Sequence, residues 1–158
     1  MSSPAIGQII PFEAKDEQGT AHTLETYSGR WLLLYFYPKD DTPGCTKEAC
    51  AIRDSWEEFK KANISVLGVS TQSASSHQKF KEKYQIPFPL LVDPDKKLVE
   101  TFGVWRKKKF MGREYMGTER ISFLVNPKGV IETIYEKVKP EEHAKEILDA
   151  VRKSLQED

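Results

Sequence analysis

Residues 31–45 read WLLLYFYPKDDTPGC, a continuously apolar run joined to a polar loop that ends in a cysteine. The apolar part, Trp31–Tyr37, predicts a strand buried on both faces of a sheet, because it is continuously apolar and aromatic. It is far shorter than the ~20 residues that a membrane helix needs. Pro38 ends this strand. Thr42, which is followed by a proline, predicts the N-cap of a helix with that proline at its first position. Cys45 is therefore expected in the first turn of a helix that follows a buried strand.

The rest of the chain predicts alternating helices and strands. Asp16–Gly19 is typical of the turn of a short N-terminal hairpin, and Asn126–Gly129 of a second hairpin near the C-terminus. The expected elements are a helix over 43–62, a strand over Ile64–Ser70, a helix over Ser73–Tyr84, a strand over Leu90–Val92, a helix over Lys96–Phe102, strands over Ile121–Val125 and Val130–Val138, and a helix from Pro140. This order predicts an α/β fold, in which a central mixed β-sheet is flanked by helices on both faces.

Length and charge limit the classes of function. The chain has 158 residues, which predicts a single domain over residues 1–158. Lys+Arg and Asp+Glu are both 24, so the chain offers no general field for nucleic acid or for an anionic membrane, and we expect neither as a partner. The basic run Arg106–Arg113 is then expected to be a solvated loop. The N-terminus shows no secretory or transit signal, which favours the cytoplasm.

The chain lacks the spacing of a metal site. His22, His77 and His143 are widely scattered, and no role is assigned to them. Cys45 and Cys50 are the only cysteines. In a reducing compartment such a pair is more often reactive than structural.

Cys45 is a candidate nucleophile. The first turn of a helix presents free N–H groups and the positive end of the helix dipole, which together favour the reactive thiolate form of a cysteine. Ligands also bind outside the carboxyl ends of strands in an α/β sheet. The alternative is that Cys45 is a small apolar residue on the buried face of its helix. The turn residues of the preceding loop favour the reactive interpretation.

Cys50 follows Cys45 by five positions. On an ideal helix this spacing gives a Cα separation of about 8.6 Å, whereas a disulfide needs roughly 4.4–6.8 Å. The two cysteines can therefore form a bond only if the first turns of the helix unwind. The alternative is that Cys50 is an unrelated helical residue.

The segment Pro38–Cys45 has the pattern P-x-x-x-T-x-x-C and resembles the active-site signature of peroxiredoxins. YFYPKDDTPGCTKEAC (35–50), FPLLVDPDKKLVETFGVW (88–105) and KKKFMGREYMGTERISFLVNPKG (107–129) resemble the subgroup of bacterioferritin comigratory protein, also called PrxQ. The resemblance covers nearly the whole chain. It implies a thioredoxin-like fold with an N-terminal β-hairpin extension, in agreement with the α/β interpretation.

The resemblance also implies roles for five residues. Cys45 matches the peroxidatic cysteine, and Cys50 matches the resolving cysteine of an intramolecular pair. Thr42 matches the hydroxyl that binds the thiolate and the peroxide, and Pro38 the proline that shields the pocket. Arg120 matches the arginine that holds the thiolate and the developing charge on the peroxide.

The implied activity is that of a thiol peroxidase for hydrogen peroxide and organic hydroperoxides, recycled by thioredoxin or a similar dithiol reductant. No metal or organic cofactor is implied, and the expected state is a monomer or a weak homodimer. Two alternatives use the same cysteines, namely a redox sensor and a general thiol–disulfide oxidoreductase, although the absence of C-x-x-C speaks against the second. From the residues alone, Arg120 could equally form a surface ion pair with Glu119 or another acidic residue. Glu48 is expected to serve the helix dipole or to position the loop.

Overall fold

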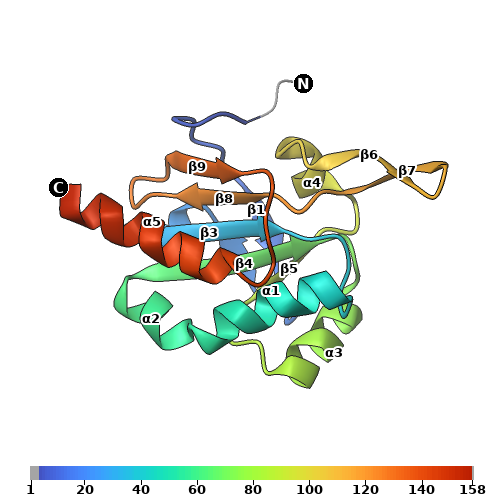
Figure 1. Cartoon of the computed structure of the whole chain (residues 1–158), viewed down its shortest axis with the longest axis horizontal. Helices are drawn as coiled ribbons and strands as arrows, with labels where there is room; N and C mark the ends of the chain where they lie inside the picture. Colours follow the sequence, from blue (N-terminus) through green and yellow to red (C-terminus); the bar gives the residue numbers. More distant parts are fainter. Residues whose placement is uncertain (1–3, 158) are drawn as a thin grey trace.

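The computed structural model describes residues 4–157 and contains a five-stranded central sheet in the order β5-β4-β3-β8-β9 (Figure 1). The strands are β3 (Trp31–Phe36), β4 (Ile64–Ser70), β5 (Leu90–Val92), β8 (Ser122–Val125) and β9 (Ile131–Tyr135). β3 pairs in parallel with β4 and antiparallel with β8. β8 and β9 form the predicted antiparallel hairpin. The prediction of a central mixed sheet is confirmed.

The helices cover the two faces of this sheet unequally. The odd-numbered side chains of β3 pack against four helices on one face, and the even-numbered ones pack against a short helix and the N-terminal segment on the other. The four helices are α1 (Pro43–Asp54), α2 (Trp56–Lys61), α3 (Ala74–Tyr84) and α5 (His143–Glu157), and the short one is α4 (Lys97–Thr101). Figure 1 shows α4 apart from the others. Both faces of β3 are therefore buried, which explains its continuous apolar run.

The N-terminal hairpin is also confirmed. β1 (Glu13–Lys15) pairs antiparallel with β2 (Ala21–Thr23), and Asp16 N donates to Thr20 O at 2.9 Å within the turn. A single 3-10 turn, η1 (Glu25–Tyr27), then leads into β3.

The expectation of a solvated loop over Arg106–Arg113 is wrong. β6 (Trp105–Phe110) and β7 (Arg113–Thr118) form an antiparallel hairpin that projects from the body of the molecule (Figure 1). Met111 and Gly112 join the strands with φ angles of 51° and 81°, which are the left-handed angles that a tight hairpin turn requires. The run of lysines lacks the apolar alternation by which a strand is recognised, so the strand pattern was hidden.

The single helix expected over 43–62 is divided into two. Ser55 has φ −103° and ψ 11° and separates α1 from α2. Ile52 and Phe59 lie on opposite sides of this break and are both fully buried in the same cluster. The apolar spacing predicted one helix because both pieces contribute to one core.

Two boundaries near the C-terminus differ from the prediction. α5 begins at His143 rather than at Pro140, because the backbone first makes a turn in which Glu142 N donates to Lys139 O at 3.0 Å. β9 ends at Tyr135 rather than at Val138. Within residues 4–157, no helix combines the length and the apolar character needed to cross a bilayer.

The close packing of β4 against its neighbours leads to a test. A Cβ atom at Gly68 would lie 2.9 Å from Leu90 Cδ2 and 3.0 Å from the Tyr35 ring. We expect Gly68→Ala to lower the free energy of unfolding by about 1–3 kcal/mol, because the added methyl overpacks a core without free space. Urea denaturation of the reduced protein measures this change.

Gly117→Ala is the matched control, because the nearest atom, Lys108 Cδ at 3.0 Å, belongs to a flexible side chain, and the next, Tyr115 Cε2 at 3.3 Å, belongs to an exposed ring that can move. Its free energy of unfolding should stay within about 0.5 kcal/mol of the wild type. Equal losses in Gly68→Ala and Gly117→Ala would contradict the packing argument.

Candidate active site

Cys45 lies in the first turn of α1, as the sequence predicts. Thr42 has extended backbone angles at the N-cap, and Thr46 N donates to Thr42 O at 2.8 Å in the first helical hydrogen bond. The N–H groups of Gly44 and Cys45 precede this bond and so have no acceptor within the helix. Cys45 is only 1% exposed, so its sulfur lies beneath the surface at the positive end of α1.

Arg120 reaches this sulfur from the segment between β7 and β8. Its Nη2 donates to Cys45 Sγ at 3.3 Å, and its Nη1 donates to Glu48 Oε1 at 2.9 Å. Cys45 and Glu48 are three positions apart and therefore share one side of α1. The two nitrogens of one rigid guanidinium thus bind a sulfur and a carboxyl group side by side. The acidic partner of Arg120 is Glu48 and not Glu119.

The Glu48 carboxyl group is fully buried. Burial raises its pKa to about 7, although the charge and the hydrogen bond of Arg120 act in the opposite direction. Its second oxygen, Oε2, has no hydrogen-bond partner among the residues that the structure describes. Burial disfavours the charged form of Arg120, but Cys45 and Glu48 outweigh this effect and raise the pKa of the guanidinium. The site therefore holds a permanent cation beside a carboxyl group that titrates near neutral pH.

Gly44 makes room for the guanidinium. A Cβ atom at this position would lie only 2.9 Å from Arg120 Nη2 and 3.5 Å from its Cζ. Any larger residue would push Arg120 away from the helix end. Gly44 therefore allows the close approach of Arg120, a role that the sequence alone does not show.

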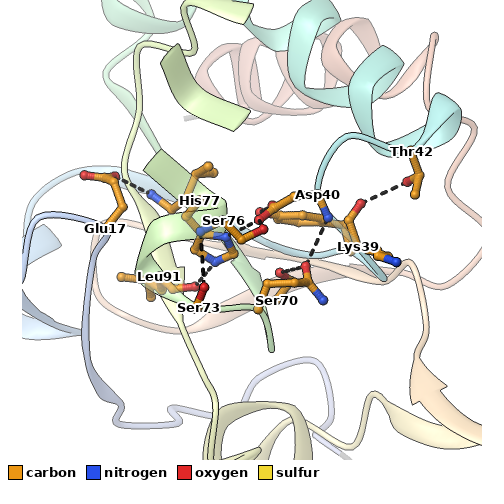
Figure 2. A network of polar contacts seen from close by, with 12 residues as sticks. Glu17, Lys39, Asp40, Thr42, Ser70, Ser73, Ser76, His77 and Leu91 are labelled. Carbon is orange, nitrogen blue, oxygen red and sulfur yellow. Dashed lines mark hydrogen bonds and ion pairs between the residues drawn. The ribbon is translucent and has the colours of Figure 1, made fainter. Parts of the chain in front are cut away.

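Thr42 and Pro38 lie in the loop that leads to Cys45. Thr42 is the N-cap residue, as predicted, but its hydroxyl donates to Lys39 O at 2.9 Å and makes no capping bond to the helix (Figure 2). The Pro38 carbonyl accepts from Gln72 Nε2 at 3.2 Å. Pro38 also borders a cavity of about 270 Å³ next to the β6–β7 hairpin. The structure brings Arg120 into contact with Cys45 and places Thr42 and Pro38 in the loop between β3 and α1.

Cys50 is half-buried on the same helix, and both cysteines are free thiols. α1 is continuous between them, so ideal helical geometry separates their Cα atoms by about 8.6 Å. A disulfide between them requires the first turns of α1 to unwind.

Sequence reasoning assigned no role to the histidines, yet all three are buried in polar networks. His22 binds Asp16 at 2.8 Å, and His143 binds Ser122 at 2.8 Å. His77 binds Asp40 at 2.7 Å, directly before the active-site helix. Asp40 and His77 are 37 positions apart, so no local spacing could have signalled this pair.

A metal site is not evident. Among residues 4–157, no three His, Cys, Asp or Glu side chains are grouped so that they could hold a metal ion. The chemistry available in the site is that of a buried thiol, a guanidinium and a carboxyl group.

Comparison with known sequences gives close matches over nearly the whole chain. The profile of the AhpC/TSA family matches residues 6–134. Peroxiredoxin Bcp of Bacillus subtilis (strain 168) is 47% identical over 148 residues, which cover 93% of this chain and 94% of that protein. Peroxiredoxin Bcp of Escherichia coli K12 is 43% identical over 144 residues, which cover 90% and 92%.

Solved structures agree with the sequence matches. Peroxiredoxin Q of Xanthomonas campestris superposes with a TM-score of 0.83 at 40% identity, covering 89% of each chain. A Cys-to-Ser mutant of PrxQ from Xylella fastidiosa superposes with a TM-score of 0.91 at 34% identity, covering 98% of this chain and 99% of that one. The expected thioredoxin-like fold is confirmed by these likenesses. Together with the sequence matches, they establish that the chain belongs to the AhpC/TSA family, among its Bcp (PrxQ) peroxiredoxins.

Proposed function

We propose that this thiol peroxidase attacks peroxides with Cys45, that Cys50 resolves the oxidised product, and that a thioredoxin-type dithiol protein recycles the disulfide. The observation that carries the proposal is the hydrogen bond of 3.3 Å from Arg120 Nη2 to Cys45 Sγ at the N-terminus of α1. A cation and a helix end at the same sulfur stabilise the thiolate, which is the reactive form. The similarity to peroxiredoxins Bcp supports the choice of a peroxide as the substrate.

In the first step the Cys45 thiolate attacks one oxygen of the peroxide ROOH. An S–O bond forms, the O–O bond breaks, and the leaving RO⁻ takes up a proton to become ROH. Cys45 is thereby oxidised to a sulfenic acid. Negative charge grows on the leaving oxygen, and the guanidinium of Arg120 provides donors that are already in place to stabilise it.

In the second step the Cys50 thiol attacks the sulfenic sulfur. An S–S bond forms and water leaves, once the first turns of α1 have unwound. A dithiol protein then reduces the disulfide by exchange and becomes oxidised itself. A Xanthomonas campestris bacterioferritin comigratory protein, 38% identical with a TM-score of 0.85, has been solved in trapped intermediate and ligand complexes that concern alkyl peroxide reduction. This likeness favours organic hydroperoxides, besides hydrogen peroxide, as substrates here.

Thr42 and Pro38 complete the proposed site. The Thr42 hydroxyl donates its hydrogen bond to Lys39 O, so its oxygen lone pairs remain available to accept a hydrogen bond from the bound peroxide. Pro38 follows β3, and we propose from its match in the peroxiredoxin signature that it limits the access of water to Cys45.

The wider expectations from the sequence remain proposals. We infer one domain over residues 1–158, a cytoplasmic location, a monomer or weak homodimer, and no nucleic-acid or membrane partner. A redox sensor remains the second candidate, since it would use the same cysteine pair. Continued consumption of peroxide with a thioredoxin system supports a peroxidase, whereas a sensor stops after one turnover.

The proposed roles of the two cysteines are tested by Cys50→Ser. After one equivalent of peroxide, we expect the wild type to contain a disulfide between Cys45 and Cys50, and Cys50→Ser to retain a sulfenic acid at Cys45. Steady turnover with thioredoxin should fall at least about tenfold in Cys50→Ser, because only slower intermolecular resolution remains. Mass spectrometry of dimedone-treated digests identifies both products.

Cys45→Ser is the companion variant and should lose peroxidase activity. Normal cycling of Cys50→Ser would rule out Cys50 as the main resolving thiol. Retained peroxidase activity of Cys45→Ser would rule out Cys45 as the nucleophile.

Glu48 competes with Cys45 for the same guanidinium. While Glu48 is protonated, its Oε1 is a neutral acceptor and the charge of Arg120 acts mainly on the Cys45 sulfur. Once Glu48 ionises, two anions share one cation in a buried site. We propose that the neutral form of Glu48 orients Arg120 without withdrawing its charge from Cys45.

The raised pKa of Glu48 predicts how stability depends on pH. The folded protein retains a proton on Glu48 up to about pH 7, whereas the unfolded chain releases it near the ordinary value of 4.5. Stability contributed by this group is therefore fully present below about pH 4.5 and is lost as the pH rises to 7. The expected loss is on the order of 3 kcal/mol.

Glu48→Gln should remove this loss, because an amide does not titrate. Urea denaturation between pH 4.5 and 8 measures the difference in unfolding free energy between the wild type and the variant. This difference should change by about 3 kcal/mol over that range. Parallel profiles for the two proteins would show that Glu48 does not titrate near 7.

A further inference from the structure

A buried pair of titratable groups lies beside the active site and is not used by the chemistry described above. Asp40 is five residues before Cys45, in the loop between β3 and α1. Its Oδ2 lies 2.7 Å from Nδ1 of His77, which comes from the first turn of α3. The two side chains are 4% and 0% exposed. Figure 2 shows His77 between Asp40 and Leu91, with Ser76 next to the carboxyl group.

Both nitrogens of the His77 ring have a hydrogen-bond partner. Its Nε2 lies 2.8 Å from Leu91 O, and because a carbonyl oxygen only accepts, Nε2 carries a hydrogen. Its Nδ1 faces the Asp40 carboxylate, which also accepts from Tyr37 Oη at 2.6 Å and from Ser76 Oγ at 2.7 Å. Burial by itself raises the pKa of Asp40, but its bonds to His77, Tyr37 and Ser76 together lower it. The Asp40 carboxyl group and the His77 ring therefore form a buried hydrogen-bonded pair.

The backbone around Asp40 is fixed as well. Asp40 N donates to Gln72 Oε1 at 3.0 Å, and Gln72 Nε2 donates to Pro38 O at 3.2 Å. Ser70 Oγ donates to the same Oε1 atom at 2.6 Å, which orients the amide. The Asp40 side chain thus bonds to α3, and the backbone of Pro38 and Asp40 bonds to Gln72, which follows β4.

The attachment weakens immediately after Asp40. Asp41 has a left-handed φ of 55°, and its side chain is exposed. It contacts Lys83 at 2.8 Å and Tyr84 at 2.6 Å on the surface, where such contacts contribute little stability. The boundary between a fixed and a loosely held backbone therefore lies between Asp40 and the helix that must unwind.

We propose that the hydrogen-bonded Asp40–His77 pair is a positioning device for the peroxidatic loop. It holds Pro38 in place, and Thr42 through the bond of its hydroxyl to Lys39 O, while a peroxide reacts at Cys45. It stays in place as the anchor when the first turns of α1 unwind. The inference rests on the proposed role of Cys45. His77 acts through Asp40 and does not touch the reacting atoms.

The test compares two histidines in similar environments. His22 bonds to Asp16 at 2.8 Å and to Tyr27 at 2.7 Å, so it also forms an Asp–His–Tyr network, but in the N-terminal hairpin. Both histidines are buried. His22→Gln therefore reproduces the loss of stability that follows from disrupting such a network, without altering the loop before Cys45.

Quench-flow experiments with thiol blocking separate the peroxide-dependent oxidation of Cys45 from the peroxide-independent formation of the disulfide. At a temperature where both variants are folded, we expect His77→Gln to lower the second-order rate constant of oxidation about tenfold, because the groups around the sulfur are misplaced. Disulfide formation should not become slower. His22→Gln should leave both rates within about twofold of the wild type. Equal effects of the two variants, or an unchanged oxidation rate in His77→Gln, would overturn the proposal.

A double-variant cycle tests whether Asp40 and His77 act as a pair. The oxidation rate of Asp40→Asn/His77→Gln should be no lower than that of the slower single variant, since either change already breaks the pair. If the losses in oxidation rate of the two single variants multiply in the double variant, the inference is overturned.

If His77→Gln does not fold, Ser76→Ala removes one donor to Asp40 and should slow oxidation about threefold. An unchanged oxidation rate in Ser76→Ala would likewise overturn the inference.

The failure of this inference is distinguishable from failure of the proposed function. If Cys45→Ser still reduces peroxide, the proposed nucleophile is wrong. If Cys45→Ser is inactive but His77→Gln oxidises at the wild-type rate, only the role of the Asp40–His77 pair is wrong.

Discussion

The hydrogen bond between Arg120 and Cys45 is the constraint from which the architecture of the site follows. A guanidinium that is largely withdrawn from solvent, as that of Arg120 is, needs partners for its donors. Cys45 accepts one of them and Glu48 accepts another, one helical turn along α1. Gly44 provides the space for this approach, since a Cβ atom there would meet Arg120. One cation therefore accounts for three residues in the first turns of α1.

The same helix has to satisfy two opposing requirements. It must be intact to present its positive end to the sulfur, and it must unwind for Cys45 to reach Cys50. The structure limits the extent of that unwinding on both sides. Asp40 is fixed before the helix, and the break at Ser55 separates α1 from α2, so that Phe59 can remain in the core. In the proposed cycle the segment that unwinds therefore lies between Asp40 and Ser55.

Local patterns in the sequence predicted the parts of the fold that depend on neighbouring residues. The apolar run Trp31–Tyr37 predicted the buried strand, and the turn residues after it predicted Cys45 at a helix start. Contacts between distant segments were beyond such patterns, because apolar periodicity does not report which polar side chains meet. The contact of Arg120 with Cys45 followed only from the family resemblance, and nothing local linked Asp40 to His77. The β6–β7 hairpin was missed because its lysines lack a strand-like alternation of apolar residues.

The central claim is that the guanidinium of Arg120 stabilises the thiolate and the charge that develops on the peroxide. Arg120→Met tests it most directly, since methionine keeps much of the volume and removes both the donors and the charge. The second-order rate constant for oxidation of Cys45 by hydrogen peroxide should fall about 100-fold or more, as expected when a preorganised donor is lost from a developing anion. A rate constant within about twofold of the wild type, in a variant shown to be folded, would contradict the account.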